Sequence, residues 1–315
     1  MRIKVITYNI DGLPETLDLN DLPIVLRPIA WLYRLFKKTT IVRINDDTNK
    51  EDKIKAISRW LASENADIIA VQEDFNFHKE LIYHLVGYNS CTHTGGFDIK
   101  NLFASVEWRT KFPFPRFKAD GLNLITKERR IRVYDETIVP WKKSYGYFNH
   151  ANDMLTHKGY RQYRIVVDNA FIVVVYVLHM DADFYYQDPN IIDDIEARKA
   201  QLKQLTEDIK QEYEAGLKYP CIIMGDFNST RKFLWDVENL YENFVKVIGD
   251  IDGLTICEAG ITDDVDRVFV INSIYAGCKI RTASCKLVNV EGNLSDHRPY
   301  VVEFNIDKLN YELDF

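Results

Sequence analysis

The chain has 315 residues, of which 46% are hydrophobic and 28% are charged, and its formal net charge is −7. This composition is ordinary for a globular protein and supplies ample apolar material for a core. The acidic balance weighs against a nucleic-acid partner, because proteins that bind phosphate backbones usually carry a basic excess. A divalent metal held in a site would nevertheless supply positive charge locally.

The sequence shows no pattern of export or of a membrane span. Its N-terminal apolar run is only a few residues long, and no apolar stretch reaches the roughly 20 residues that cross a bilayer. The five cysteines are odd in number and form no CxxC pair, which favours buried free thiols in a reducing compartment over disulfides or zinc. We therefore expect a cytoplasmic monomer, or a secreted protein if a leader preceded Met1.

The predicted elements alternate between strands and helices along the whole chain. Short apolar or β-branched runs predict strands at 3–8, 67–72, 122–126, 130–134, 171–178, 221–225, 265–271 and 299–305. Apolar residues at helical spacing predict helices over 51–64, 75–86 and 192–213. No linker rich in serine, glycine or proline divides the chain. We therefore predict one domain over 1–315 with an α/β fold, a four-layer sandwich of two packed mixed β-sheets flanked by helices.

Four short polar motifs, far apart in the sequence, lie beside predicted strands. They are Thr7-Tyr8-Asn9, Gln72-Glu73, Gly225-Asp226-Phe227-Asn228 and Ser295-Asp296-His297. A strand that buries apolar side chains and then releases Asn, Glu, Asp or His at its end builds a site at a sheet edge. Several such strands can bring oxygen ligands to one hard cation and place imidazoles beside it. The pattern therefore predicts a metal-assisted reaction on a phosphate ester.

Glu73 and Asn9 are the first candidate residues of this site. Glu73 follows a buried apolar strand, so we expect its carboxylate to bind a divalent cation, Mg²⁺ by preference and Mn²⁺ or Ca²⁺ as alternatives. Asn9 is expected beside it, as a further metal ligand or as a donor to a phosphate oxygen. The competing interpretations are a glutamate in a cap or salt bridge and an asparagine in a turn before Asp11.

Asp226 and Asn228 alternate along an extended segment, so both side chains can point to one face. This arrangement suits a carboxylate that holds an attacking water and an amide that holds a phosphate oxygen. A Gly-Asp-x-Asn surface turn is the alternative, and the apolar run before Gly225 weighs against it.

His297 follows Asp296 and precedes an Arg-Pro pair. A histidine near neutrality can accept a proton from water or donate a hydrogen bond to a phosphoryl group. Its other ring nitrogen needs an acceptor, and Asp266 at the start of a predicted strand is the candidate. Asp296 is expected to ligate the metal directly or to complete its outer shell. Either Asp226 or His297 can be the base that activates the water.

Together with further stretches, these motifs resemble the endonuclease/exonuclease/phosphatase superfamily of metal-dependent phosphoesterases. The matching stretches are TYNIDGL (7–13), VQE (71–73), VLHMDAD (177–183), MGDFNS (224–229), VDRVFV (265–270) and LSDHRP (294–299). Each is weak alone, but six in this order over nearly the whole chain are specific. We expect in-line attack of water on a phosphoester, without a covalent enzyme intermediate.

Two branches of this superfamily compete within the chain. The stretches 152–160 and 179–183 resemble neutral sphingomyelinase C, although Asp181 stands where that branch usually has Gln. The stretches 9–13 and 265–269 look like tyrosyl-DNA phosphodiesterases instead. We expect a phospholipid head-group ester as the substrate. A DNA end, a phosphotyrosyl-DNA or an inositol phosphate is the alternative.

The resemblance adds His179 and Lys158 to the candidate site. His179 ends the most apolar strand and is followed by Asp181 and Asp183, so we expect it to contact the phosphate or protonate the leaving group. Lys158 precedes a glycine in the matched stretch and is expected to face the phosphate, with a solvent-facing lysine as the alternative. His157, which precedes Lys158 in the matched stretch, fits either a site role or a structural one. The other four histidines are expected to be solvated or structural, namely His78, His84, His93 and His150.

Two further segments are candidates for contact with a lipid surface. Residues 22–38 place apolar side chains on one helical face with cations beside them, as in a helix that lies in a membrane interface. Packing of that helix on the protein's own core is the alternative. The aromatic stretch 108–148 can insert among acyl chains, bind choline by cation–π attraction, stack on nucleic-acid bases or be buried.

Overall fold

The computed structural model describes residues 1–12, 47–96, 102–108, 116–145, 153, 156–182, 191–216, 218–229, 240–260 and 264–309. The helix predicted over 22–38 lies outside these residues, as do Asp183, His150 and the Phe-Pro pairs of 112–115. Among the described residues, no helix is both long enough and apolar enough to cross a membrane.

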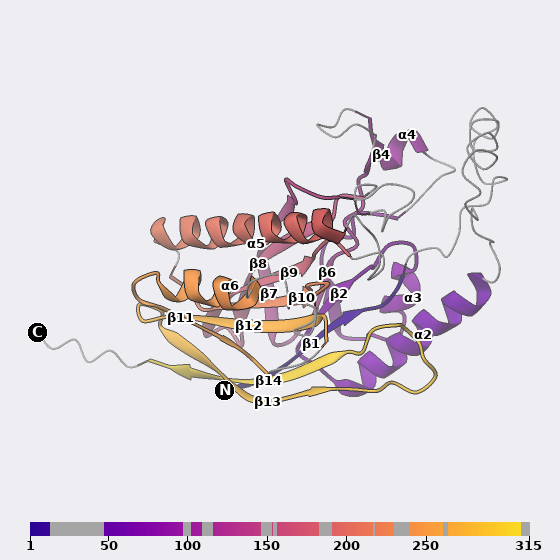
Figure 1. Ribbon diagram of the computed structural model, residues 1–315. Coiled ribbons are helices and arrows are strands. Elements are labelled where there is room, and N and C mark those ends of the chain that lie inside the picture. The colour runs from indigo at the N-terminus through magenta and orange to yellow at the C-terminus, as the bar shows by residue number, and fades with distance from the viewer. Residues whose placement is uncertain are drawn as a thin grey trace, which may run out of the picture.

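Two six-stranded mixed sheets form the centre of the fold in the described part of the chain (Figure 1). The first has the order β13 (Cys278–Leu287), β14 (Tyr300–Lys308), β1 (Arg2–Asn9), β2 (Ile68–Gln72), β6 (Asn123–Lys127) and β3 (Tyr88–Ser90). The second has the order β11 (Leu254–Glu258), β12 (Asp266–Ser273), β10 (Cys221–Asp226), β9 (Phe171–His179), β8 (Gly159–Val167) and β7 (Ile131–Pro140). A separate pair joins β4 (Val106–Glu107) to β5 (Arg116–Phe117).

Helices cover the outer faces of both sheets (Figure 1). In the described part of the chain these are α2 (Asp47–Glu64), α3 (His78–Ile82), α5 (Ile191–Glu214) and α6 (Leu240–Gly249), while the short α4 (Leu102–Ser105) lies beside β4. Leu61 of α2 is buried in one cluster with Val71 of the first sheet. Leu205 of α5 is buried in another cluster with Ile223 of the second sheet. A third cluster, which includes Val5, fills the space between the sheets. The four-layer α/β sandwich predicted from the sequence is confirmed.

The strand registers gather polar strand ends at one edge of the sandwich. In the second sheet, β10 pairs in parallel with β9, so that Asp226 is opposite His179, and antiparallel with β12, so that Asp226 is also opposite Asp266. In the first sheet, β1 and β2 are parallel and both end at the same edge, with Asn9 opposite Gln72. Residues from distant parts of the sequence therefore meet where these strands end.

Several elements differ from the sequence predictions. No strand was predicted at β8, β11 or β13. The interior of β8 contains the buried Arg161 and Gln162, and β13 is an edge strand with mostly exposed residues, so neither shows a clear apolar run. The helix predicted over 75–86 spans only His78–Ile82. Before it, the backbone turns, and the N–H of Phe75 donates to the carbonyl of Glu73 at 2.9 Å.

All five cysteines lie in the described residues and are free thiols, but they are not all buried. Cys221 and Cys278 are buried, Cys91 is half-buried, and Cys257 and Cys285 are exposed. The expectation of buried thiols is therefore wrong for three of the five. The two exposed cysteines lie on edge strands, β11 and β13: Cys257 points to solvent in β11, and Cys285 lies in a run of exposed residues of β13.

Candidate active site

The candidate site is built where the two sheets meet at their polar edge. Asn9, the last residue of β1, reaches across to the second sheet. Its amide nitrogen Nδ2 lies 3.0 Å from Glu73 Oε1 and 3.0 Å from Asp226 Oδ2. Two carboxylates from different sheets therefore converge on one amide group.

The loop that carries Glu73 has an unusual backbone. Glu73 has a φ of 61°, in the left-handed region that side chains other than glycine seldom adopt. A Cβ added at Gly12 would stand 2.2 Å from the carbonyl oxygen of Glu73, so only glycine permits this close approach. The two loops after β1 and β2 are thus packed directly on each other, which fixes where the Glu73 carboxylate emerges.

His297 enters the site from the loop before β14. Its Nδ1 lies 2.7 Å from Asp266 Oδ2, and because a carboxylate only accepts, Nδ1 carries the hydrogen. Its Nε2 faces Asp226 Oδ2 at 3.6 Å and Asn9 Nδ2 at 3.4 Å. Burial works against a charged imidazole, but the carboxylates of Asp226 and Asp266 outweigh it and raise the pKa of His297 to about 11.

Ser295 anchors the loop that carries His297. Its hydroxyl donates to the carbonyl of Asn9 at 2.8 Å and accepts the backbone N–H of His297 at 3.1 Å. Asp296 instead points outward. Its side chain is 79% exposed, and its Oδ1 is 4.0 Å from His297 Nε2. The structure therefore places Asp296 at the rim of the site, and direct ligation of a metal by this residue stays a prediction.

His179 lies on the opposite side of Asp226 and is fully enclosed. Its Nε2 is 3.0 Å from Lys158 Nζ and 3.5 Å from Asp226 Oδ2. An ammonium group only donates, so Nε2 accepts and the imidazole is neutral. Burial and the charge of Lys158 lower the pKa of His179 well below its ordinary value. Lys158 also forms an ion pair with Asp153, so it faces the site rather than solvent.

Asn228 follows the end of β10 in the left-handed region, with a φ of 48°, so the extended segment predicted over 226–228 does not reach it. Its backbone N–H donates to Asp226 Oδ1 at 2.8 Å, and its side-chain amide donates to the carbonyl of Met180 at 2.9 Å. The first bond orients the Asp226 carboxylate. The second uses one of the two amide hydrogens, and among the described residues the other is left for a ligand.

Sequence reasoning missed two groups that support this site. Asp153 belongs to the stretch that resembles sphingomyelinase C, but its pairing with Lys158 depends on a tertiary contact. Trp141, which was grouped with aromatic residues for lipid or base contact, is buried, and its indole N–H donates to the carbonyl of His179 at 2.8 Å. Of the alternatives left open for the aromatic stretch, burial holds for Trp141, because the ring packs between the sheet and its covering helix.

Glu73 and Asp226 provide the oxygen donors that fit a hard divalent cation. Both carboxylates face the amide nitrogen of Asn9. Burial raises the pKa of Glu73 to about 7, which shows that nearby positive groups do not fully offset its negative charge. Mg²⁺ needs only one or two protein carboxylates, and the donor set suits the expected Mg²⁺, Mn²⁺ or Ca²⁺. Asn9 turns its oxygen away to accept the N–H of Asp11 at 3.0 Å, so as it lies here Asn9 is a donor.

Comparison with known proteins identifies the family of this chain. The model of the endonuclease/exonuclease/phosphatase family matches residues 6–297. The chain belongs to this family. Members of the endonuclease/exonuclease/phosphatase family are phosphoester hydrolases, and they generally use divalent metals. A search of curated proteins finds no match.

Solved structures with the endonuclease/exonuclease/phosphatase fold cover nearly the whole chain at low identity. TDP2 of D. rerio, complexed with a single-strand DNA product, has a TM-score of 0.57 at 13% identity, covering 96% of this chain and 99% of its own. Beta toxin of Staphylococcus aureus has a TM-score of 0.57 at 14% identity, covering 95% and 99%. The mannosyl-6-phosphatase Bt3783 of Bacteroides thetaiotaomicron has a TM-score of 0.57 at 15% identity, covering 96% and 99%. At these identities the likeness shows the fold alone.

Proposed function

We propose that this protein is a divalent-cation-dependent phosphodiesterase that hydrolyses a phospholipid head-group ester, in the manner of a sphingomyelinase C. The reaction class rests on one observation, the convergence of Glu73, Asp226 and His297 around the amide of Asn9. The lipid substrate rests on the resemblance of 152–160 and 179–183 to the sphingomyelinase branch.

In this proposal Glu73 holds the cation, which when bound neutralises phosphate charge and stabilises the leaving oxygen. Asp226 takes the proton of the attacking water. Its Oδ1 is fixed by the N–H of Asn228 at 2.8 Å, so that Oδ2 is the oxygen that faces the centre of the site. A carboxylate held in this way can align and deprotonate a water for in-line attack.

His297 acts as a hydrogen-bond donor to the phosphoryl group rather than as the base. Its Nδ1 hydrogen is engaged by Asp266, and two nearby carboxylates favour the charged ring, so Nε2 also carries a hydrogen. Asn9 Nδ2 provides a second donor beside it. Such donors, aimed where charge develops, are among the strongest contributions to catalysis. On the other side of Asp226, Lys158 carries positive charge and holds His179 neutral.

Three substrates tested side by side would examine the proposal. Phosphocholine release from sphingomyelin, cleavage of DNA and phosphate release from an inositol phosphate are each measured with Mg²⁺, with EDTA, and after Mg²⁺ is restored. We expect sphingomyelin turnover that EDTA abolishes and Mg²⁺ restores. Activity confined to DNA or to the inositol phosphate would replace the lipid substrate and leave the reaction class intact.

Variants test the assigned roles in the same assay. His297→Ala and Asp226→Asn should each lower kcat by about 10²–10⁴-fold, the range for loss of a general acid or base, while circular dichroism stays native. His84→Ala is the matched control. Among the described residues, two groups of side chains could hold a metal ion, Asp226 with Asp266 and His297, and Asp74 with His78 and His93, and His84 belongs to neither. Full activity of His297→Ala would contradict the role of His297. Turnover that EDTA leaves unchanged would contradict the need for a divalent cation.

A further inference from the structure

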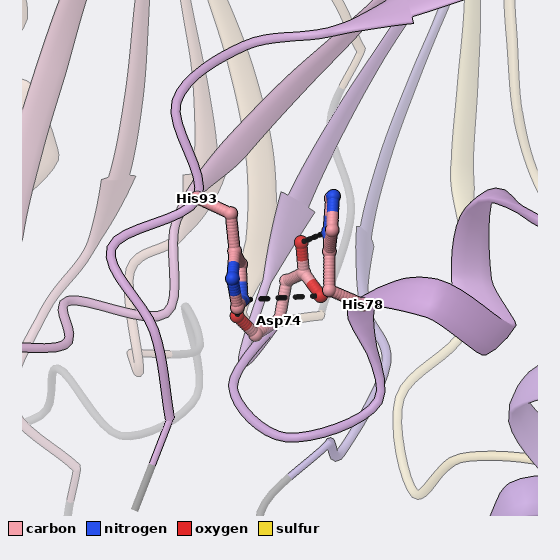
Figure 2. A group of neighbouring side chains, drawn as sticks. All are labelled: Asp74, His78 and His93. Atoms are coloured by element: carbon pink, nitrogen blue, oxygen red, sulfur yellow. Dashed lines mark hydrogen bonds and ion pairs between the residues drawn. The ribbon is translucent and has the colours of Figure 1, made fainter.

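A second cluster of side chains that could bind a metal begins at Asp74, the residue after Glu73. Asp74 follows Glu73 in the loop after β2, His78 is the first residue of α3, and His93 lies in the coil after β3. Figure 2 shows the three side chains turned toward one another from these separate segments. One donor atom from each lies within 4.8 Å of the other two. Nothing in the sequence indicated that His78 and His93, expected to be solvated or structural, would meet at Asp74.

Asp74 is the buried centre of this cluster. Its side chain is 0% exposed, and its Oδ2 accepts hydrogen bonds from His78 Nδ1 at 2.6 Å and Asn123 Nδ2 at 2.9 Å. Among the described residues, its other oxygen, Oδ1, has no hydrogen-bond partner. That oxygen faces His93 Nε2 at 3.9 Å. A buried carboxylate oxygen without a partner is costly, and a cation held between Asp74 and the imidazoles would supply the missing interaction.

We propose that Asp74, His78 and His93 form a second metal site that binds a transition-metal cation, Zn²⁺ by preference. Two imidazoles and one carboxylate are a ligand set for Zn²⁺, whereas Mg²⁺ and Ca²⁺ take oxygen ligands. The site therefore differs in chemistry from the oxygen-rich catalytic pair of Glu73 and Asp226. The side chains of His78 and His93 are 17% and 23% exposed, which leaves room for a water as the fourth ligand.

Hydrogen bonds around the cluster already orient the ligands. When the metal takes Nδ1 of His78, the ring hydrogen moves to Nε2, which faces Ser90 Oγ at 3.4 Å. Asn123 holds the Asp74 carboxylate in place. Histidine and carboxylate ligands are commonly oriented by such neighbouring groups. His93 Nε2 lies 2.9 Å from the backbone carbonyl oxygen of Asp74, and this hydrogen bond is given up when the metal takes that nitrogen.

Metal binding requires the ligand atoms to rearrange: the 2.6 Å contact between His78 Nδ1 and Asp74 Oδ2 must lengthen, and the 3.9 Å contact between His93 Nε2 and Asp74 Oδ1 must shorten. Ligand atoms around tetrahedral Zn²⁺ stand roughly 3.3 Å apart, given bonds of about 2.0–2.1 Å. The two rings are stacked, with centroids 4.3 Å apart and planes 15° from parallel, so one ring must tilt. His93 lies on a coil and can make this change. The ion would then join three segments of the chain. Because Asp74 is next to Glu73, the ion would also fix the loop that carries the Glu73 carboxylate.

Zinc binding to the tag-free protein tests the site directly. The metal-depleted chain is incubated with Zn²⁺ in excess Mg²⁺, desalted and analysed for bound zinc. We expect one equivalent in the wild-type chain and its loss in His78→Ala/His93→Ala and in His93→Ala alone. His84→Ala and Asp226→Asn should keep the equivalent. Co²⁺ in place of Zn²⁺ should give the intense visible absorption of a tetrahedral site, absent from His93→Ala.

Two results would overturn the second site. A wild-type chain that retains no zinc would show that the three side chains form only a hydrogen-bonded stack. Zinc that is lost in Asp226→Asn and kept in His93→Ala would place the ion in the catalytic pair instead. Far-UV circular dichroism of each variant separates loss of metal from loss of fold, and the partly exposed His93 makes the single variant the safer one.

Discussion

His297 Nδ1 lies 2.7 Å from Asp266 Oδ2, and this contact joins the loop before β14 in one sheet to the first residue of β12 in the other. The imidazole is thereby held with Nε2 toward Asp226. Asp266 itself does not face Glu73 or Asn9 in the contacts found, so its effect on chemistry acts through His297. We therefore propose that Asp266 is a positioning residue.

Replacing Asp266 with Asn should lower kcat by about 10–100-fold, the usual cost of losing a group that orients an active-site histidine. The side chain keeps its size, so the melting temperature should change little and KM should stay near the wild-type value. Asp264→Asn is the matched control, because Asp264 pairs with Arg298 instead. Equal kinetics for the two variants would show that Asp266 does not position His297.

Gly225 allows β10 to approach β9 next to Asp226. Its φ is 148°, and a Cβ at this position would stand 2.0 Å from the carbonyl oxygen of Leu178. Gly225→Ala should therefore destabilise the fold by about 1–3 kcal/mol or more, measured by urea unfolding. Gly249→Ala is the control, since no described atom lies within 4 Å of its added Cβ, and it should be neutral or stabilising. A stable Gly225→Ala would contradict the register of the two strands.

Arg161 is a buried cation in the interior of β8. Its side chain is 0% exposed and contacts Asp120 at 2.6 Å and Glu136 at 2.9 Å. Arg161→Met leaves the buried Asp120 without its partner and should cost about 3–5 kcal/mol of unfolding free energy. Arg281→Met removes an ion pair with Asp307 at the surface and should cost at most about 1 kcal/mol. Similar losses of unfolding free energy in the two variants would contradict the burial of the Arg161 ion pairs.

Thiol labelling should divide the cysteines by burial. Cys257 and Cys285 are exposed and should react with a maleimide under native conditions, whereas Cys221 and Cys278 should react only after unfolding. Burial raises the pKa of Cys221 to about 12 and that of Cys278 to about 11, which suppresses their thiolates further. Mass spectrometry of labelled peptides identifies each site. Rapid native labelling of Cys221 would contradict the packing of β10.

The layer arrangement was predictable because most of its strands are apolar runs that can be recognised in the sequence without knowledge of their partners. β9 and β10 are nearly continuous apolar runs, as expected for strands buried on both faces. β8 was missed because it buries Arg161, which only the partner carboxylates from other segments make tolerable. A local hydrophobic pattern cannot show that Arg161 is neutralised by Glu136 and Asp120, which are 25 and 41 positions away in the sequence.

The candidate site was predictable to the extent that its residues stand at strand ends in recognisable motifs. Asp226 and His297 do so, and the structure brings them within 3.6 Å of each other. The direction of the Asn9 amide was not predictable, since it depends on the N–H of Asp11. His78 and His93 carry no motif, and only the fold brings both to Asp74.

The central claim is that Glu73, Asp226 and His297 share one cation-binding pocket. Diffraction from crystals soaked in Mn²⁺, recorded at the manganese absorption edge, locates the ion without reference to activity. The account predicts an anomalous peak within coordination distance of Glu73, beside Asp226 and His297. Ordered density for these three side chains with no peak among them, or with manganese bound only elsewhere, would contradict it.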